Sequence, residues 1–358
     1  MSSDRLINCH IHTFTAAHVP RDYPHWALRP FKSMPFVLRW MAALVRLIGQ
    51  HELAATLDRL HRFQTEAMRA TQAEVLDRVV PHYPKSTRFV VLPMDMERMD
   101  HGPVARGLED QLAELSALRR DPRFGDAVIP FVTVDPRRPD AGAIVRRWIL
   151  DEGFRGLKLY PRLGYAPDHP RLMDEVYPLI AERNLPVMTH CSRGGVIGRG
   201  IATSQGDAWS SPQAWAPVRD RFPDLRICLA HFGGMTDWRA YVDEGIDPRD
   251  PGAKAANWQV CIRDMIEGDD WPNLWTDISY TLFHFDDFIP FLKIFLENEK
   301  LAARVLFGSD FYMTRQEALS ERAVCFRLRA ALGEETFRRI AIENPRVWLG
   351  EVPAATAA

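Results

Sequence analysis

The sequence of 358 residues lacks a hydrophobic run that could cross a membrane. Its most apolar stretch, residues 34–50, is too short, and Arg39 and Arg46 make it too charged. No basic segment followed by an apolar stretch opens the chain, so no signal peptide is expected. The net charge is only −2, which gives no general field for nucleic acid or an anionic membrane. A small-molecule substrate is therefore the expected partner.

Cysteines are also scarce. The five cysteines are odd in number and have no paired spacing, and none forms a Cys-x-x-Cys zinc motif. Cys9 and Cys228 lie in predicted strands and Cys191 directly follows one, where a buried thiol behaves as a small apolar residue. The sequence predicts no disulfide framework, and a reducing cytoplasm is the expected location.

Eight short apolar segments predict parallel strands buried on both faces. They are residues 5–10, 87–94, 127–134, 154–160, 185–190, 225–231, 273–279 and 303–309. Helices are predicted between them at 103–120, 139–151, 171–183, 212–222, 285–298 and 315–331. Residues 10–15 contain no glycine, so the phosphate loop of a doubly wound sheet is missing. We therefore expect a single α/β domain over 1–358, a (β/α)₈ TIM barrel.

A long insertion, residues 13–85, separates the first two predicted strands. Its segments 34–50 and 51–70 are expected to be helical. The preferred interpretation is a packed cover over the barrel face, and the alternative is a lid or dimer contact, with membrane-surface binding a remote third. As a lid, the insertion would indicate a hydrophobic substrate through its aromatic side chains, which are Trp26, Phe31, Phe36 and Trp40.

Four of the predicted strands end in a potential metal ligand. His10 and His12 end the first strand, and His190, His231 and Asp310 end the fifth, sixth and eighth. Residues two apart on a strand share a face, so both imidazoles of the His-x-His pair can reach one ion. The alternatives are buried, hydrogen-bonded histidines and a helix N-cap at the aspartate. Because catalytic groups gather where barrel strands end, we interpret the set as a divalent metal centre.

This order of ligands is similar to the amidohydrolase superfamily, and most similar to its amidohydrolase-2 branch of hydrolases and of decarboxylases related to aminocarboxymuconate-semialdehyde decarboxylase. The resemblance covers residues 5–13 and 85–349. Its marks are Asn-Cys-His-Ile-His at 8–12, Gly-Leu-Lys-Leu-Tyr-Pro at 156–161, Thr-His-Cys at 189–191, Ala-His-Phe-Gly-Gly at 230–234, Phe-Gly-Ser-Asp-Phe at 307–311 and Glu-Asn-Pro-Arg-Val-Trp-Leu at 343–349.

The resemblance implies one divalent metal held by His10, His12, His190 and Asp310. Zn²⁺ suits this set best, and Mn²⁺, Fe²⁺ or Co²⁺ are compatible. In relatives with one metal the histidine at position 231 polarises the substrate carbonyl or shuttles a proton, and in relatives with two it binds the second ion. The resemblance also implies a homodimer.

Lys158 stands where relatives with two metals carry a carboxylated lysine. We prefer a role as clamp for a substrate carboxylate or as charge partner, and keep open a carbamate that bridges a second ion and a structural ion pair. Tyr160, Arg162 and Arg193 follow the fourth and fifth strands and are candidates to bind a substrate anion. Asp277 and Tyr280 end the seventh strand and would line the pocket.

The expected function is hydrolysis of an ester, lactone or amide by metal-activated water, with Asp310 as general base and His231 polarising the carbonyl. The alternative is non-oxidative decarboxylation of an aromatic or enoic acid in the same site. Many such decarboxylases carry glutamate at the first ligand position, so the presence of histidine at position 10 slightly favours hydrolysis. A non-enzymatic binding module is disfavoured because every expected ligand is present.

Overall fold

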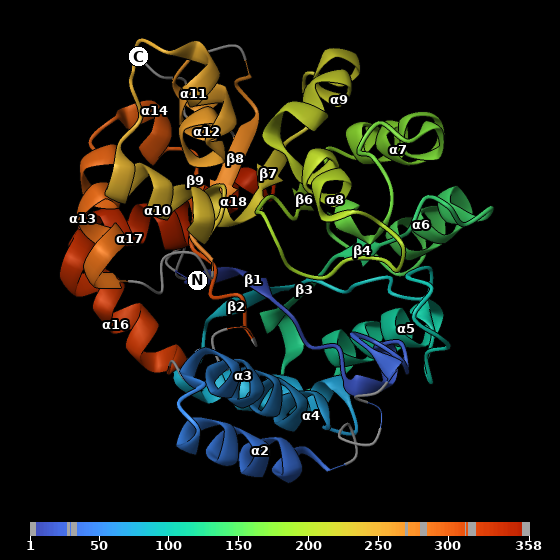
Figure 1. Ribbon diagram of the computed structural model, residues 1–358. Coiled ribbons are helices and arrows are strands. Elements are labelled where there is room, and N and C mark those ends of the chain that lie inside the picture. Colours follow the sequence, from blue (N-terminus) through green and yellow to red (C-terminus); the bar gives the residue numbers. More distant parts are fainter. Residues whose placement is uncertain are drawn as a thin grey trace.

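The computed structural model describes residues 5–26, 29, 34–268, 271–279, 285–311, 313 and 320–352, and its short strands lie in the middle of a ring of helices (Figure 1). All strands are parallel to their neighbours. They are β1 (Ile7–Ile11), β2 (Arg88–Val91), β3 (Val128–Pro130), β4 (Val132–Thr133), β5 (Leu157–Leu159), β6 (Val187–Thr189), β7 (Ile227–Leu229), β8 (Leu274–Asp277) and β9 (Val305–Leu306).

The strands follow one another in sequence order, β1 to β3 and then β4 to β9. Only Phe131 separates β3 from β4, so these two form the single strand predicted at 127–134. The ring closes between its first and last strands: Cys9 N donates to Phe307 O at 2.8 Å, and Ile11 forms a parallel bridge with Phe311. The TIM barrel expected from the sequence is confirmed.

Helices cover the outside of the ring. They are α2 (Pro35–Leu47), α3 (His51–Ala67), α4 (Gln72–Val79), α5 (Leu108–Arg120), α6 (Ala141–Leu150), α7 (Tyr177–Glu182), α8 (Thr203–Ser210), α9 (Ala216–Arg221), α10 (Met235–Glu244), α11 (Pro251–Ala256), α12 (Trp258–Glu267), α13 (Phe285–Phe295), α14 (Glu299–Ala302), α16 (Glu321–Leu332), α17 (Glu334–Arg338) and α18 (Asn344–Trp348). Side chains cap several N-termini; for example, Asn257 accepts from Val260 N at the start of α12. No helix among the described residues is both long and apolar enough to span a membrane.

Alternate strand residues divide the core into an inner and an outer layer. Ile7, Cys9, Met188, Cys228 and Trp275 belong to the smaller cluster, which fills the barrel. The larger cluster lies between the strands and the surrounding helices. The interior is thus packed with side chains, and a site must form above this layer, at the C-terminal ends of the strands.

The insertion 13–85 is helical, as predicted, and contains α2, α3 and α4. The first helix of this group, α2, packs against α3. Of the residues with a predicted role, Phe31 and Tyr280 lie outside the described residues, as does the first part of the helix predicted at 315–331.

Candidate metal centre

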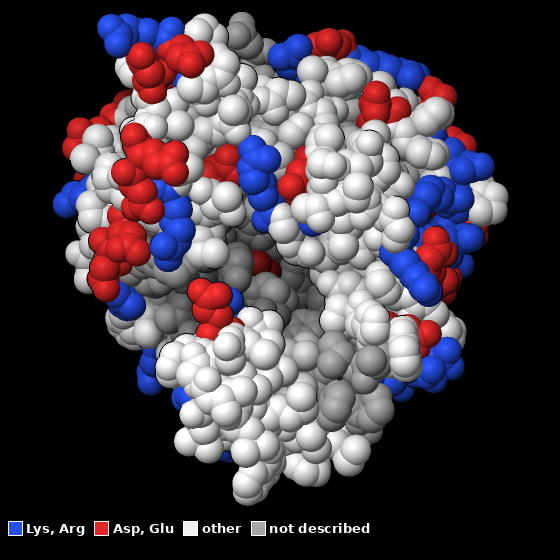
Figure 2. All heavy atoms as spheres, in the orientation of Figure 1, with Lys and Arg blue, Asp and Glu red and all other residues white. Residues whose placement is uncertain are grey.

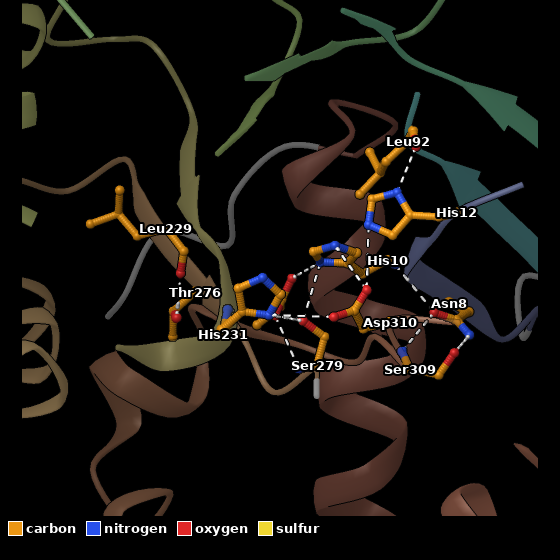
Figure 3. A network of polar contacts seen from close by, with 11 residues as sticks. Asn8, His10, His12, Leu92, Leu229, His231, Thr276, Ser279, Ser309 and Asp310 are labelled. Atoms are coloured by element: carbon orange, nitrogen blue, oxygen red, sulfur yellow. Dashed lines mark hydrogen bonds and ion pairs between the residues drawn. The ribbon is translucent and has the colours of Figure 1, made fainter. Parts of the chain in front are cut away.

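The predicted ligands converge at the C-terminal ends of three strands (Figure 3). One potential ligand atom from each of His10, His231 and Asp310 lies within 4.8 Å of the other two, and all three side chains are buried. The His12 Nε2 atom adds a fourth donor, 3.4 Å from Asp310 Oδ1. Three imidazoles and one carboxylate form a donor set that suits a divalent transition metal.

A backbone irregularity in β1 allows this convergence. The pairing of β1 with β2 shifts register between Asn8 and Ile11, as at a β-bulge. Cys9 therefore points into the barrel interior, while His10 and His12 both reach the site beyond it. A bulge commonly re-aims side chains in this way next to active sites.

The residues after β7 and β9 adopt backbone conformations that aim their side chains at the site. The φ angle is 69° at His231 and 50° at Asp310, in the left-handed region that non-glycine residues rarely occupy. Hydrogen bonds hold both: His231 N donates to Asp277 Oδ1 at 2.9 Å, and Asp310 N donates to His10 O at 2.8 Å. Backbone strain maintained by such contacts is typical of functional sites.

The close approach of two strands explains why residue 308 is a glycine. A Cβ atom at this position would lie 2.6 Å from the Cβ of His10, closer than real carbon contacts. Glycine therefore lets the strand that carries Asp310 lie directly beside the strand that carries His10.

Hydrogen bonds indicate the tautomer of two histidines. His12 Nδ1 lies 2.7 Å from Leu92 O, and since a carbonyl only accepts, Nδ1 carries the hydrogen. His10 Nδ1 lies 2.7 Å from Asp277 Oδ2 and donates in the same way. Each Nε2 then presents a lone pair. This pattern, a ligand histidine held through its other nitrogen, is general in metalloproteins.

Two polar atoms in the centre have no hydrogen-bond partner among the described residues. They are His10 Nε2 and Asp310 Oδ1, both fully shielded from solvent. Unpaired buried polar atoms are costly, and here both are acceptors, with lone pairs directed into the site. A bound cation would satisfy them, so the residues present fit a divalent metal.

Ser279 connects the histidines. Its hydroxyl donates to Asp277 Oδ1 and lies 2.9 Å from His231 Nδ1 and 3.2 Å from His10 Nδ1. Because the hydroxyl hydrogen is directed to the carboxylate, His231 donates through Nδ1 and keeps a lone pair on Nε2. The sequence placed Asp277 at the pocket but missed Ser279; its position two residues after Asp277, on the same side of an extended strand end, was the available signal.

Burial sets the protonation states of the site. It lowers the pKa of His10 to about 4 and also holds the pKa values of His190 and His231 below the ordinary range. Burial alone would raise the pKa values of the Asp277 and Asp310 carboxyls, but the neighbouring imidazoles, His10 first, hold both below their ordinary range. Neutral imidazoles and ionised carboxylates are the forms that bind metal.

His190, at the end of the fifth predicted strand, lies at the side of the group. Its ring stacks on Tyr160, with centroids 4.1 Å apart, and lies 5.0 Å from the His231 ring. Its Nε2 lies 3.3 Å from Gly194 O and 3.2 Å from Ser192 Oγ. His190 is thus adjacent to the centre, but is not one of the three residues whose atoms approach most closely.

Lys158 lies on β5 and is buried in the barrel. Burial lowers the pKa of its ammonium to about 8, against the raising effect of Asp277 and Asp310. Neither carboxylate is within 4 Å of the ammonium as an ion pair in the described part of the chain. The structural ion pair considered for this lysine is therefore not found there.

The candidate anion-binding residues already have partners. Arg162 pairs with Asp207, and Arg193 Nε donates to Asp237 Oδ2 at 3.0 Å. Tyr160 Oη accepts from Val196 N at 3.0 Å. Since the two carboxylates come from other segments, sequence spacing gave no sign of them. Arg162 lies in a 3-10 helix, Pro161–Leu163, directly after β5, and Arg193 lies in the segment between β6 and α8. The molecular face drawn in Figure 2 is hollowed at its centre.

Comparison with known proteins gives a family and a set of similar folds. A sequence model of the Amidohydrolase family matches residues 9–350. A search of curated proteins finds no match.

Three solved structures illustrate the similarity, and at these identities they establish the fold alone. A probable 2-pyrone-4,6-dicarboxylic acid hydrolase from Acinetobacter baumannii, with citric acid bound, is 14% identical with TM-score 0.54, over 97% of this chain and 99% of that one. A 5-carboxyvanillate decarboxylase from Sphingomonas paucimobilis is 14% identical with TM-score 0.55, again over 97% and 99%. A 5-carboxyvanillate decarboxylase from Novosphingobium aromaticivorans, complexed with manganese and 4-hydroxy-3-methoxy-5-nitrobenzoic acid, is 12% identical with TM-score 0.52, over 98% and 99%.

Proposed function

The chain belongs to the Amidohydrolase family, and we propose that it hydrolyses a C–O or C–N bond of a small ester, lactone or amide with the help of one divalent metal. The observation that carries the proposal is the pair of buried, unpartnered acceptors, His10 Nε2 and Asp310 Oδ1, beside the other donors. An acceptor pair of this kind is stable only with a cation between its members or a proton shared by them.

His10, His12 and Asp310 would hold the metal, with His190 as a further ligand at the side of the group. Zn²⁺ is our first choice, and the manganese bound to one structural neighbour keeps Mn²⁺ open. A bound divalent ion supplies polarisation of a carbonyl and water of lowered pKa. A second ion would require carboxylation of Lys158.

Asp310 is proposed as general base. The pKa of its carboxyl is held below the ordinary range, so it is ionised at neutral pH and can accept the proton of the attacking water. The same carboxyl then returns that proton to the leaving group.

His231 is proposed to act beside it. With the hydrogen on Nδ1 directed toward Ser279, its Nε2 can accept a proton, and the resulting imidazolium can polarise a substrate carbonyl. Lys158, Tyr160, Arg162 and Arg193 are proposed to bind an anionic group of the substrate.

Metal content tests the cofactor first. Elemental mass spectrometry of the chelator-free protein should find close to one transition metal ion per chain, and about two would indicate the Lys158 carbamate. The double variant His10→Ala/His12→Ala should lose the metal, whereas His101→Ala, a loop histidine away from the centre, should keep it. Full metal retention by the double variant would exclude the proposed site.

Activity tests the reaction. A panel of lactones, esters and amides should show turnover that disappears on chelation and returns with added Zn²⁺ or Mn²⁺. No metal-dependent release of acid from any member of the panel would contradict hydrolysis.

Decarboxylation of an aromatic or enoic acid is the second candidate. Lys158 favours it: a buried ammonium with a pKa lowered to about 8 could hold a substrate carboxylate or donate a proton. Two of the structural neighbours described above are decarboxylases. Release of CO₂ from an aromatic acid, without uptake of water, would favour this reaction over hydrolysis.

A further inference from the structure

Helix α2, Pro35–Leu47, is apolar on almost every side. Its sequence, PFVLRWMAALVRL, contains two charged residues, Arg39 and Arg46, and no acidic one. Helices on the surface of a globular protein normally have one apolar stripe and a polar face opposite. A helix that is apolar all round is usually covered on more than one side.

One side of α2 is covered by α3. Leu38 and Ala42 are fully buried against Leu57, with Met41 and Val45 around them. This small cluster is separate from the two clusters of the barrel. The pair α2 and α3 therefore has little core of its own, and further burial of α2 would stabilise it.

The opposite side of α2 is exposed. Phe36, Trp40, Leu44 and Leu47 follow one another at intervals of four, four and three residues and form one stripe, which continues to Ile48. Their exposed fractions are 57%, 70%, 62%, 83% and 75%. At about 200 Å² for a fully exposed large side chain, the stripe presents on the order of 700 Å² of apolar surface.

Figure 2 places this surface on the outside of the molecule. The surface over α2, at the lower edge of the view, is almost free of charged side chains, whereas the rest of this face carries many. Apolar patches larger than a few hundred Å² are uncommon on monomers and indicate a binding surface.

We propose that the stripe is the interface of a two-fold dimer, in which α2 packs antiparallel against α2 of a second copy. The exposed area is close to the roughly 800 Å² per partner of a standard protein interface. The stripe is self-complementary: with the axis midway between Trp40 and Leu44, each Trp40 faces the partner's Leu44, and each Phe36 lies near the partner's Leu47 and Ile48. A two-fold contact requires this match of a surface with itself.

Charge favours a second copy over a lipid surface. Helices that lie on membranes combine an apolar face with a polar face rich in lysine and arginine. The polar complement of α2 is only Arg39 and Arg46, and Arg46 Nη2 lies 2.6 Å from Asp58 Oδ2. Little positive charge is left to attract anionic lipid, whereas aromatic residues with arginine at the margin are typical of protein interfaces.

Sedimentation velocity of the full chain, across a concentration series, tests the proposal. The wild-type protein should sediment with the mass of two chains at micromolar concentration. Trp40→Glu and Leu47→Glu should each sediment as monomers, or weaken association at least about 100-fold, because each places a carboxylate in an apolar contact. Phe326→Glu, at an exposed phenylalanine of α16 outside the stripe, is the control and should remain a dimer.

Circular dichroism of each variant checks that the fold is kept, and the substituted side chains are exposed, so the fold should be unaffected. A wild-type monomer at about 100 μM would overturn the proposal, as would a Trp40→Glu/Leu47→Glu double variant that still dimerises. Cosedimentation of a monomeric wild-type protein with phosphatidylcholine–phosphatidylglycerol vesicles would assign the stripe to a lipid surface instead.

Discussion

Asp277 Oδ2 lies 2.7 Å from His10 Nδ1, so a carboxylate at the end of β8 orients the imidazole that β1 carries to the metal centre. The second oxygen of the same carboxylate accepts from His231 N and from Ser279. One side chain thus fixes three groups of the site, which lie on β1, just after β7 and just after β8.

Substitution of Asp277 by Asn should weaken metal binding. An amide has one acceptor oxygen in place of two, so the His10, His231 and Ser279 donors cannot all be satisfied. We expect about 10- to 100-fold lower metal affinity, the usual cost of removing such a partner. Competition with a chromogenic chelator measures it. Asp237→Asn removes another buried carboxylate away from the centre and should leave the affinity unchanged; equal losses in the two variants would contradict a specific role.

Ser279→Ala should separate metal binding from turnover. The hydroxyl contacts His231 Nδ1 at 2.9 Å and, without it, the Nδ1–H tautomer is less favoured. We expect the metal to be retained and kcat to fall by about tenfold or more, within the range of acid–base contributions. Parallel measurement of metal content and kcat tests this. Unchanged kcat with full metal content would show that Ser279 does not direct His231.

Gly308→Ala should disturb the centre through the backbone. The new methyl group would lie 2.6 Å from the Cβ of His10, so the two strands must separate. We expect a loss of roughly 1–3 kcal/mol in the free energy of unfolding and weaker metal retention, as for other overpacked sites. Urea denaturation and metal analysis measure both. Gly252→Ala in α11 meets no contact below 3.2 Å and is the control.

Stability of the metal-free protein should fall as the pH is lowered from 6.5 to 4. The pKa of His10 is lowered to about 4 by burial, whereas in the unfolded chain it is near 6.5. Above pH 6.5 the imidazole is neutral in both states. Between pH 6.5 and 4 the unfolded state binds a proton that the folded state does not bind, and this proton uptake stabilises the unfolded state. The loss through His10 is roughly 3 kcal/mol when complete.

Urea denaturation between pH 7 and 4, with a chelator present, measures this loss. His10→Asn should reduce the slope, while His190 and His231, whose pKa values are also lowered, maintain the remainder. A free energy of unfolding that does not change over this range would contradict neutral, buried imidazoles.

The local pattern of the sequence was enough to place the barrel. Each strand is a short apolar run because it is buried on both faces, and that signal lies within a few residues. The same locality placed His10, His12 and Asp310 at strand ends, where the fold brings them together. Two helices of the insertion, α2 and α3, lie within the segments 34–50 and 51–70 that the sequence indicated as helical.

Contacts between distant segments were decided only by the tertiary structure. Asp277 lies 267 residues from His10 in sequence, and no spacing rule joins them. The carboxylate partners of Arg162 and Arg193 come from other elements, Asp207 from α8 and Asp237 from α10. The exposure of Trp40 is likewise a tertiary result, because an apolar helix predicts burial and only the packed structure shows which side stays uncovered. Side-chain chemistry and periodicity act locally, whereas the pairing of strands, and with it the site, depends on how the whole ring closes.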